Sequence, residues 1–421
     1  PMKRLLQGDV GSGKTVVAAI SIYAVVNSGY QVALMAPTEV LAEQHLNSLK
    51  EFLKDSDLEI NFLSSSVKDR SQVMNNISAG KPGLYIGTHA LIQDKIFFSN
   101  LGLVIIDEQQ RFGVDQRKKL ISDSEITPDQ LVMTATPIPR TTALSIYGDL
   151  EISTINELPP GRKPIISHLY SGLKKDNEKV FEKCSKHLDD NSQIFVVCPY
   201  IEESESSDIQ AAEKVFLEYS KKFIKYNVVL LHGKMSYEEK EKIMRSMQEG
   251  SIDILVSTVV IEVGIDIPNA TLMIIESAER FGLNQLHQLR GRVGRGEKQS
   301  ECIFHVTNKK SLNTISEEGV KRLEAISKMS DGFKLSEIDL EIRGEGKVTG
   351  KNQSGRSDLK IADLRYDYAL LLQSKKIYDD IDSLESSNKV FEEAKLLFPN
   401  YFQADGTTSV SYTHLTLPTK A

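Results

Sequence analysis

The stretch Gly8-Asp9-Val10-Gly11-Ser12-Gly13-Lys14-Thr15 decides how the first part of this chain folds. It fits the pattern G-x-x-x-x-G-K-[ST], in which the glycines let the backbone curl so that successive N–H groups point at a phosphate. Lys14 would reach the outer phosphates of a nucleotide, and Thr15 would offer its hydroxyl to Mg²⁺. A strand-like run precedes the stretch, and the apolar run 15–26 that follows it predicts a buried helix. We therefore expect a strand, a phosphate-binding loop formed by all the quoted residues, and a helix.

Two series of short apolar runs, separated by helical patterns, extend along the chain from this unit. This alternation predicts two α/β lobes in tandem, each built on a parallel sheet. The turn-rich segment 158–164 lies between the two series and is expected to be a linker. The expected strands are Arg4–Gln7, Gln31–Ala36, Gly83–Gly87, Leu103–Asp107 and Gln130–Thr134 in the first lobe, and Gln193–Cys198, Asn227–Leu231, Ile252–Ser257, Thr271–Ile275 and Glu301–His305 in the second.

The same patterns divide the chain into regions. We expect the first lobe over 1–160 and the second over 161–311, followed by a mostly helical region over 312–407. The segment 408–421 resembles translated sequencing-adaptor sequence, so we expect it to be non-native and leave it out of the fold prediction. Because the chain opens directly on the phosphate-loop unit, we also expect it to be a fragment of a longer protein.

The composition is that of a globular protein with no membrane span. Hydrophobic residues make up 40% and charged residues 26% of the 421 residues. No apolar run reaches the roughly 18 residues that a spanning helix needs. The three cysteines lack metal-ligand spacing, which favours reduced, buried thiols in a cytosolic protein. A net charge of −7 neither predicts nor excludes a nucleic-acid partner.

Two further segments predict the rest of the nucleotide site. A buried strand ends in Asp107 and Glu108, where the first acid can hold Mg²⁺ through water and the second can polarise the attacking water. Far along the chain, the segment 288–296 interleaves arginines with glycines, and Arg292 and Arg295 would share the phosphate oxygens through their guanidinium groups. The catalytic candidates are Lys14, Asp107, Glu108, Gln110, Gln288, Arg292 and Arg295.

In this order, the segments resemble helicase superfamily 2. The phosphate loop resembles motif I, 107–110 motif II, 134–136 motif III and 288–296 motif VI, while 36–39, 87–89 and 257–268 resemble motifs Ia, Ib and V. The resemblance covers about residues 1–370 and implies two RecA-like lobes with ATP bound between them. It further implies that Asp266 contacts the nucleotide ribose and that Thr38, Thr88, His89 and Thr258 contact the DNA backbone.

Within that superfamily, the chain most resembles the RecG family. The residues that carry this resemblance are Met133–Thr141 (MTATPIPRT), Ala278–Leu283 (AERFGL) and Asp339–Gly346 (DLEIRGEG), continuing to 353–355. The last segment resembles the translocation hairpin of the RecG and Mfd families, which implies that Arg343 and Gln353 help to convert lobe closure into movement along DNA.

Three positions depart from the family pattern. Gln110 stands where motif II usually has His, Glu345 where the hairpin usually has Pro, and Asn352 where it tends to have Arg. In the family this position faces the lobe interface, so we expect the presence of Gln in place of His to alter how ATP hydrolysis is coupled to DNA contact.

The resemblance implies an ATP- and Mg²⁺-dependent DNA helicase or translocase. Its substrates would be branched duplex DNA, namely replication forks and Holliday junctions, in recombination and repair. It would be a bacterial, cytoplasmic, nucleoid-associated monomer without a membrane partner, and a single-stranded DNA-binding protein would be an accessory partner.

Three alternatives stay open at this point. A translocase of the Mfd family, which couples transcription to repair, shares the hairpin. A P-loop kinase of a small metabolite would need only the first lobe and would leave 165–305 unexplained. A DNA clamp without catalysis would keep the fold, although intact Lys14, Asp107, Glu108 and Arg295 argue against it.

Overall fold

The computed structural model divides the chain into two compact units, residues Pro1–Pro137 with Ser153–Leu335 and residues Ile138–Ile152 with Ser336–Ala421. Both sheets described below belong mainly to the first unit. The residues that the structure describes are 1–63, 70–92, 96–108, 127–134, 150–157, 163–199, 205–258, 267–306, 315–343 and 373.

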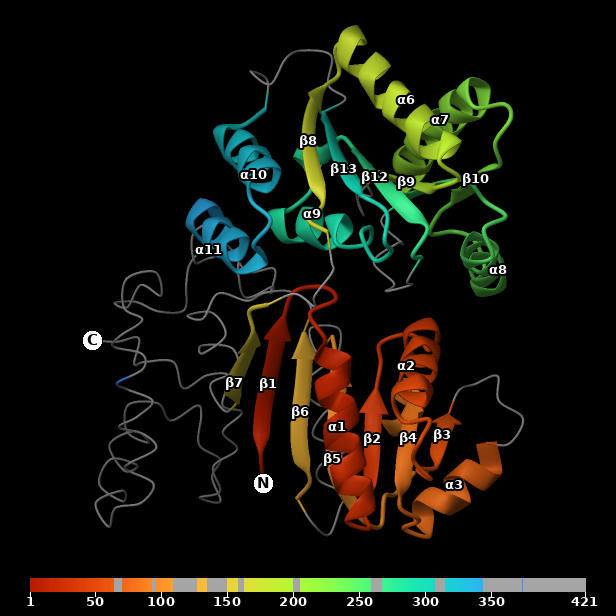
Figure 1. Ribbon diagram of the computed structural model, residues 1–421, viewed down its shortest axis with the longest axis vertical. Coiled ribbons are helices and arrows are strands. Elements are labelled where there is room, and N and C mark those ends of the chain that lie inside the picture. Colours follow the sequence, from red (N-terminus) through yellow and green to blue (C-terminus); the bar gives the residue numbers. More distant parts are fainter. Residues whose placement is uncertain are drawn as a thin grey trace. The chain divides into compact units, whose positions relative to one another are not determined.

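The first sheet has seven strands in the order β3-β4-β2-β5-β6-β1-β7 (Figure 1). The pairings from β3 through to β1 are all parallel, as the buried apolar runs predicted. The strands are β1 (Lys3–Gly8), β2 (Gln31–Met35), β3 (Ile60–Leu63), β4 (Gly83–Gly87), β5 (Leu101–Asp107), β6 (Asp129–Thr134) and β7 (Glu151–Ile155).

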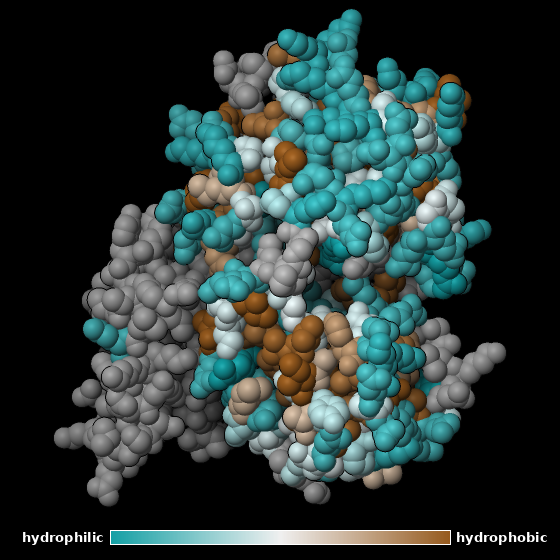
Figure 2. Space-filling model, in the orientation of Figure 1, coloured by the Kyte–Doolittle hydropathy of each residue, from teal (hydrophilic) through white to brown (hydrophobic). Residues whose placement is uncertain are grey.

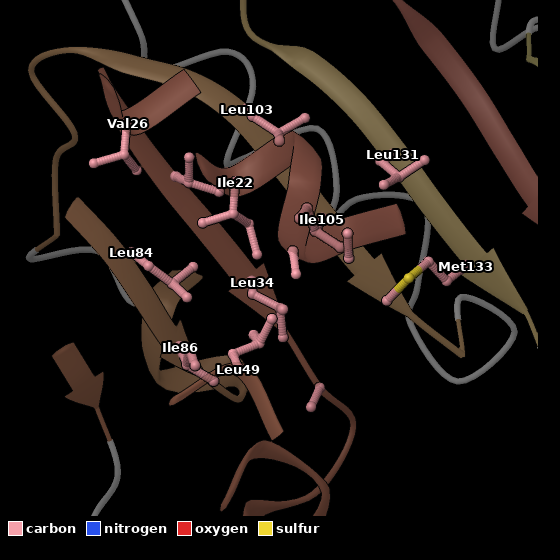
Figure 3. Packing of buried hydrophobic residues seen from close by; sticks show 14 of the residues in the cluster. Ile22, Val26, Leu34, Leu49, Leu84, Ile86, Leu103, Ile105, Leu131 and Met133 are labelled. Carbon is pink, nitrogen blue, oxygen red and sulfur yellow. The ribbon is translucent and has the colours of Figure 1, made fainter. Parts of the chain in front are cut away.

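Both faces of this sheet are covered. Along β5, Leu103 and Ile105 belong to one buried cluster and Val104 and Ile106 to another, because successive strand side chains point to opposite faces. The first cluster includes side chains of α1 and α2, and Figure 3 shows Ile22 among the strand residues there. The second cluster includes side chains of α3 and η1. The helices are α1 (Lys14–Asn27), α2 (Glu39–Phe52), α3 (Arg70–Ser78) and η1 (His89–Ile92).

The second sheet has six strands in the order β10-β11-β9-β12-β13-β8, again all parallel (Figure 1). Its strands are β8 (Ile166–Ser171), β9 (Gln193–Cys198), β10 (Val228–Leu231), β11 (Ile254–Thr258), β12 (Ala270–Glu276) and β13 (Glu301–Val306). Its helices are α6 (Lys174–Asp189), α7 (Glu205–Lys222), α8 (Tyr237–Gln248), η5 (Ala278–Arg280) and α9 (Leu283–Arg290). Two further helices follow, α10 (Glu317–Lys328) and α11 (Gly332–Arg343).

The predicted fold class is confirmed, while β3, β7 and β8 were missed. All three are edge strands whose side chains are mostly half-buried, so their sequences lack a continuous apolar run. The cysteines Cys184, Cys198 and Cys302 are free and buried, and burial raises the pKa of the Cys302 thiol to about 12. No helix among the described residues combines the length and hydrophobicity that a bilayer span requires.

The prediction that run 15–26 forms a buried helix was wrong for one face of it. Ile22 is fully buried, but Ile20 is 65% exposed and Val16 and Val17 are also exposed. Figure 2 shows hydrophobic surface in the region where α1 lies. The run is apolar on all sides, and that pattern cannot tell a helix packed on one side from a helix packed all round.

Candidate nucleotide site

The parallel order of the first sheet brings the predicted phosphate loop and the predicted acidic pair to one edge. β1 and β5 are both neighbours of β6, where Gln7 is in register with Thr134 and Asp107 with Met133. Parallel strands end at the same edge of a sheet, and ligands of open α/β sheets bind outside those carboxyl ends. The loop after β1 and the acids after β5 therefore lie on the same side of the sheet.

The phosphate loop has the conformation that its glycines predicted. Gly11 and Gly13 have φ values of 73° and 93°, in the left-handed region that glycine adopts most easily. α1 begins directly after Gly13, so the positive end of the helix dipole faces the loop. The first turn of α1 carries no acidic residue that would offset this positive charge. Lys14 Nζ donates to the carbonyl oxygens of Gly8 at 2.8 Å and Asp9 at 2.9 Å. The ammonium group thus lies over the curl of the loop.

Two observations fit this loop to a phosphate. Ser12 is buried, and its Oγ has no hydrogen-bond partner among the described residues. Such a buried hydroxyl costs about 1–3 kcal/mol, which a phosphate oxygen would relieve by accepting its hydrogen bond. Burial lowers the pKa of Lys14 although Asp107 and Glu108 oppose that shift, and the positive charge of Arg295 lowers it further. An anion at the loop would stabilise this ammonium group.

The carboxylate of Asp107 is held from two sides. His45 Nε2 lies 2.7 Å from Asp107 Oδ2, and the N–H of Glu108 donates to Asp107 Oδ1 at 3.1 Å. Burial alone would raise the pKa of Asp107, but the hydrogen bond with His45 and the charge of Lys14 outweigh it, so the pKa lies below its usual value. With the Thr15 hydroxyl, this ionised carboxylate supplies oxygen donors of the kind that Mg²⁺ prefers.

Glu108 departs from ordinary strand geometry directly after Asp107. Its φ of 52° is uncommon for a residue with a side chain, and its N–H also lies 3.1 Å from the carbonyl oxygen of Met133. Strained backbone of this kind concentrates at functional sites. The separate roles expected for the two neighbouring carboxylates stay predictions.

His45 was missed by the sequence reasoning. It lies on α2, on a face that also buries Ala42 and Leu49. The helical spacing from these residues indicates a buried histidine, but it cannot show which strand end the imidazole meets.

The glycine–arginine segment divides into one inward arginine and two that lie nearer the solvent. Arg290 is buried, and its Nη1 donates to main-chain carbonyl oxygens at the end of α10. Gln288, Arg292 and Arg295 are half-buried. The charge of Arg295 reaches Lys14, whose pKa it helps to lower. The structure therefore brings a cation from the second sheet toward the phosphate loop of the first.

The predicted DNA contacts have varied surroundings. Thr38 caps α2, because its Oγ1 accepts a hydrogen bond from the N–H of Leu41 at 3.3 Å. Thr88 is half-buried at the end of β4, and His89 begins η1, with its side chain outside the described residues. Thr258 is fully buried, and its hydroxyl has no hydrogen-bond partner among the described residues. Their contacts with DNA stay predictions.

Several predicted positions fall outside the described residues. They are Gln110, Asp266, Gln353, the side chain of Arg343, and the departures Glu345 and Asn352.

Three family models match successive parts of this chain. They are described as DEAD/DEAH box helicase over residues 2–144, helicase conserved C-terminal domain over residues 177–297, and ATP-dependent DNA helicase RecG, domain 3, C-terminal, over residues 329–400. The first two models fall on the first and second sheets.

Curated relatives agree with these models. The chain is 48% identical over 410 residues to the ATP-dependent DNA helicase RecG of Aquifex aeolicus (strain VF5), covering 95% of this chain and 51% of the relative. The chain matches the motor region of RecG helicases. It is also 48% identical to the RecG of Bacillus subtilis (strain 168), covering 93% of this chain and 56% of the relative. The chain thus spans about half the length of the curated RecG proteins it matches.

A solved RecG structure shares the fold. The structure of RecG bound to three-way DNA junction aligns with a TM-score of 0.71 at 41% identity, covering 88% of this chain and 47% of that chain. The resemblance to the RecG family is confirmed by these matches.

Proposed function

We propose that this chain is an ATP-driven DNA motor that acts on branched duplex DNA. One observation carries the proposal: His287 Nε2 of α9 lies 2.8 Å from Asp9 Oδ1 in the phosphate loop, so the segment after α9 that carries Arg292 and Arg295 lies beside that loop. A phosphate bound at the loop would meet cations from both sheets, which is the arrangement that phosphoryl transfer needs. The RecG relatives, curated as ATP-dependent DNA helicases, support the same activity.

The loop residues would bind and orient ATP. Lys14 and the buried Ser12 hydroxyl would donate hydrogen bonds to the phosphate oxygens, together with the N–H groups at the start of α1. Glu108 would accept a proton from the attacking water and orient it toward the γ-phosphate. Arg292 and Arg295 would stabilise the negative charge that builds up on the leaving and transferred oxygens.

The metal and ribose contacts complete the proposed site. Thr15 and Asp107 would hold Mg²⁺, which when bound supplies charge neutralisation to the phosphate oxygens. Asp266 would contact the ribose, and Gln110 and Gln288 would act where the two sheets meet the nucleotide. The residues of each sheet form only part of this nucleotide site. Hydrolysis would therefore require residues of both sheets to contact the same nucleotide.

Movement along DNA rests on the predicted contact residues. Hydroxyls and loop N–H groups position a DNA backbone without reading its sequence, so a motor of this kind would be indifferent to base sequence. The proposed contacts are Thr38, Thr88, His89, Thr258, Arg343 and Gln353. A three-way junction is bound by the solved RecG structure, and we extend that substrate class to this chain. A monomer in the bacterial cytoplasm at the nucleoid, with a single-stranded DNA-binding protein as accessory partner, completes the proposal.

The test is ATP turnover by the purified 421-residue chain, with and without duplex DNA that carries a three-way branch. We expect turnover that requires Mg²⁺ and rises when DNA is added. Arg295→Ala should lower turnover about a thousandfold. Arg245→Ala is the matched control, because it removes an exposed arginine of α8. Turnover that ignores DNA, or an Arg295 variant as active as the Arg245 variant, would contradict the proposal.

A further inference from the structure

A chain of hydrogen bonds runs from the end of α10 through α9 to the phosphate loop. Arg290 Nη1 donates to the carbonyl oxygens of Ile326 at 2.8 Å and Met329 at 2.6 Å, and Nη2 lies 2.9 Å from His287 Nδ1. His287 Nε2 lies 2.8 Å from Asp9 Oδ1. All five residues belong to the first compact unit, and both Arg290 and His287 are buried.

The chemistry of arginine fixes the proton of His287. A guanidinium group only donates hydrogen bonds, so His287 Nδ1 must accept from Arg290 and carries no proton. The imidazole is therefore neutral, with its proton on Nε2, and that N–H donates to the Asp9 carboxylate. Arg290 in turn binds carbonyl oxygens at the C-terminal end of α10, where a helix has acceptors to spare and favours a cation.

Asp9 connects His287 to the backbone and to Lys14 of the phosphate loop. Its Oδ1 also accepts from the N–H of Val10 at 2.7 Å, and its carbonyl oxygen accepts from Lys14 Nζ at 2.9 Å and from the N–H of Ser12 at 3.1 Å. Burial would raise the pKa of Asp9, whereas the hydrogen bonds from His287 and Val10 and the charge of Lys14 lower it. An ionised carboxylate is the stronger acceptor for His287.

A close backbone approach supports the same contact. A Cβ added to Gly291 would lie 3.1 Å from Val10 Cβ and 3.1 Å from Val10 Cγ2, which is tighter than ordinary contact. The glycine after α9 thus lets the helix end pack directly on the loop. Arg292 follows this glycine at once, and Arg295 lies three residues further on.

We propose that His287 is a positioning residue of the nucleotide site. It holds the end of α9 against the phosphate loop through Asp9, and so sets Arg292 and Arg295 over the phosphates. Arg290 is the anchor that keeps His287 in its donor tautomer, and it has no direct contact with the nucleotide. This inference rests on the proposed ATP hydrolysis and names the contact on which its geometry depends.

Two substitutions separate the hydrogen bond from the bulk of the side chain. His287→Leu removes the donor, whereas His287→Gln keeps an amide donor at similar reach. Losing a hydrogen bond to a charged group should lower kcat for ATP roughly tenfold to a hundredfold, while the Kd for ATP changes much less, because Lys14 and the loop remain. His287→Gln should recover most of kcat.

The control is a half-buried histidine–carboxylate pair in the second sheet. His168 Nε2 lies 2.7 Å from Glu301 Oε2, and this pair joins β8 to the start of β13. His168→Leu should lower stability about as much as His287→Leu and leave kcat at the wild-type value. If both variants lose kcat equally, the effect of His287 is structural only, and the inference is overturned.

A double-mutant cycle and a spectroscopic measurement complete the test. If the two side chains act as one contact, the double variant Asp9→Ala/His287→Leu has about the same kcat as the less active of the two single variants. If the losses of kcat in the single variants instead add up in the double variant, the inference is overturned. Independently of activity, ¹⁵N NMR of labelled histidine should show His287, identified by its loss in the Leu variant, as the neutral Nε2–H tautomer. A neutral Nδ1–H form would refute the contact even in an active chain. A wild-type chain without turnover, but with the expected tautomer, would instead refute the proposed function alone.

Discussion

Truncating Ile22 tests how strongly α1 is bound to the first sheet. Ile22 is 0% exposed and lies in the cluster with Leu34, Leu103 and Ile105 on two parallel strands (Figure 3). Ile22→Ala removes the side chain beyond Cβ, which costs about 2.4 kcal/mol at roughly 0.8 kcal/mol per carbon. Neighbours fixed in a sheet cannot collapse fully into the space, so a cavity term adds to this cost. We expect a total loss of roughly 3–4 kcal/mol in the free energy of unfolding.

Ile20→Ala on the same helix is the matched control. Ile20 is 65% exposed, so its truncation should change the free energy of unfolding by less than about 0.5 kcal/mol. Both changes alter helix propensity equally, and burial is what separates the two variants. Urea unfolding followed by far-UV circular dichroism measures both, and Ile22→Ala should move the midpoint down by about 1 M or more. Equal shifts in the two variants would refute the assignment of the buried and exposed faces of α1.

Three further predictions follow from single contacts. Thr38→Ala removes the cap of α2 and should lower the free energy of unfolding by about 1 kcal/mol, whereas Thr38→Ser should keep most of it; thermal unfolding of both variants decides. Burial would lower the pKa of His305, but its hydrogen bond with Glu276 outweighs this and raises the pKa, so its stabilising contribution is complete below about pH 6.5 and is lost as pH rises through the folded value. His305→Gln should therefore flatten the fall in stability as the pH rises above about 6.5, and an unchanged slope would contradict this. A Cβ on Gly87 would lie 2.7 Å from a carbonyl oxygen of β3, so Gly87→Ala should cost about 1–3 kcal/mol, while Gly233→Ala, with open space around it, should cost almost nothing by the same measurement.

Local patterns were enough to predict most of the fold. Continuous apolar runs gave the central strands of both sheets, because a strand covered on both faces has no polar side chains to interrupt it. The glycine spacing gave the phosphate loop, because a left-handed φ at Gly11 and Gly13 is available mainly to glycine. The sequence also predicted the acid pair at the end of β5, because polar residues directly after a buried apolar run lie where the strand reaches the edge of the sheet.

The sequence by itself determined which residue types stand at the ends of the strands and in what order. Only the tertiary structure decided which of them meet, because hydrogen bonds between residues far apart leave no spacing signal. His45 and Asp107 are separated by 62 positions, and Asp9 and His287 by 278. The same reason explains Arg290, which the glycine–arginine pattern grouped with its neighbours. Its guanidinium is buried against carbonyl oxygens of α10, while Arg295 lies toward Lys14. Because α9 packs between the phosphate loop and α10, Arg290 and Arg295 have different surroundings, although their sequence context is similar.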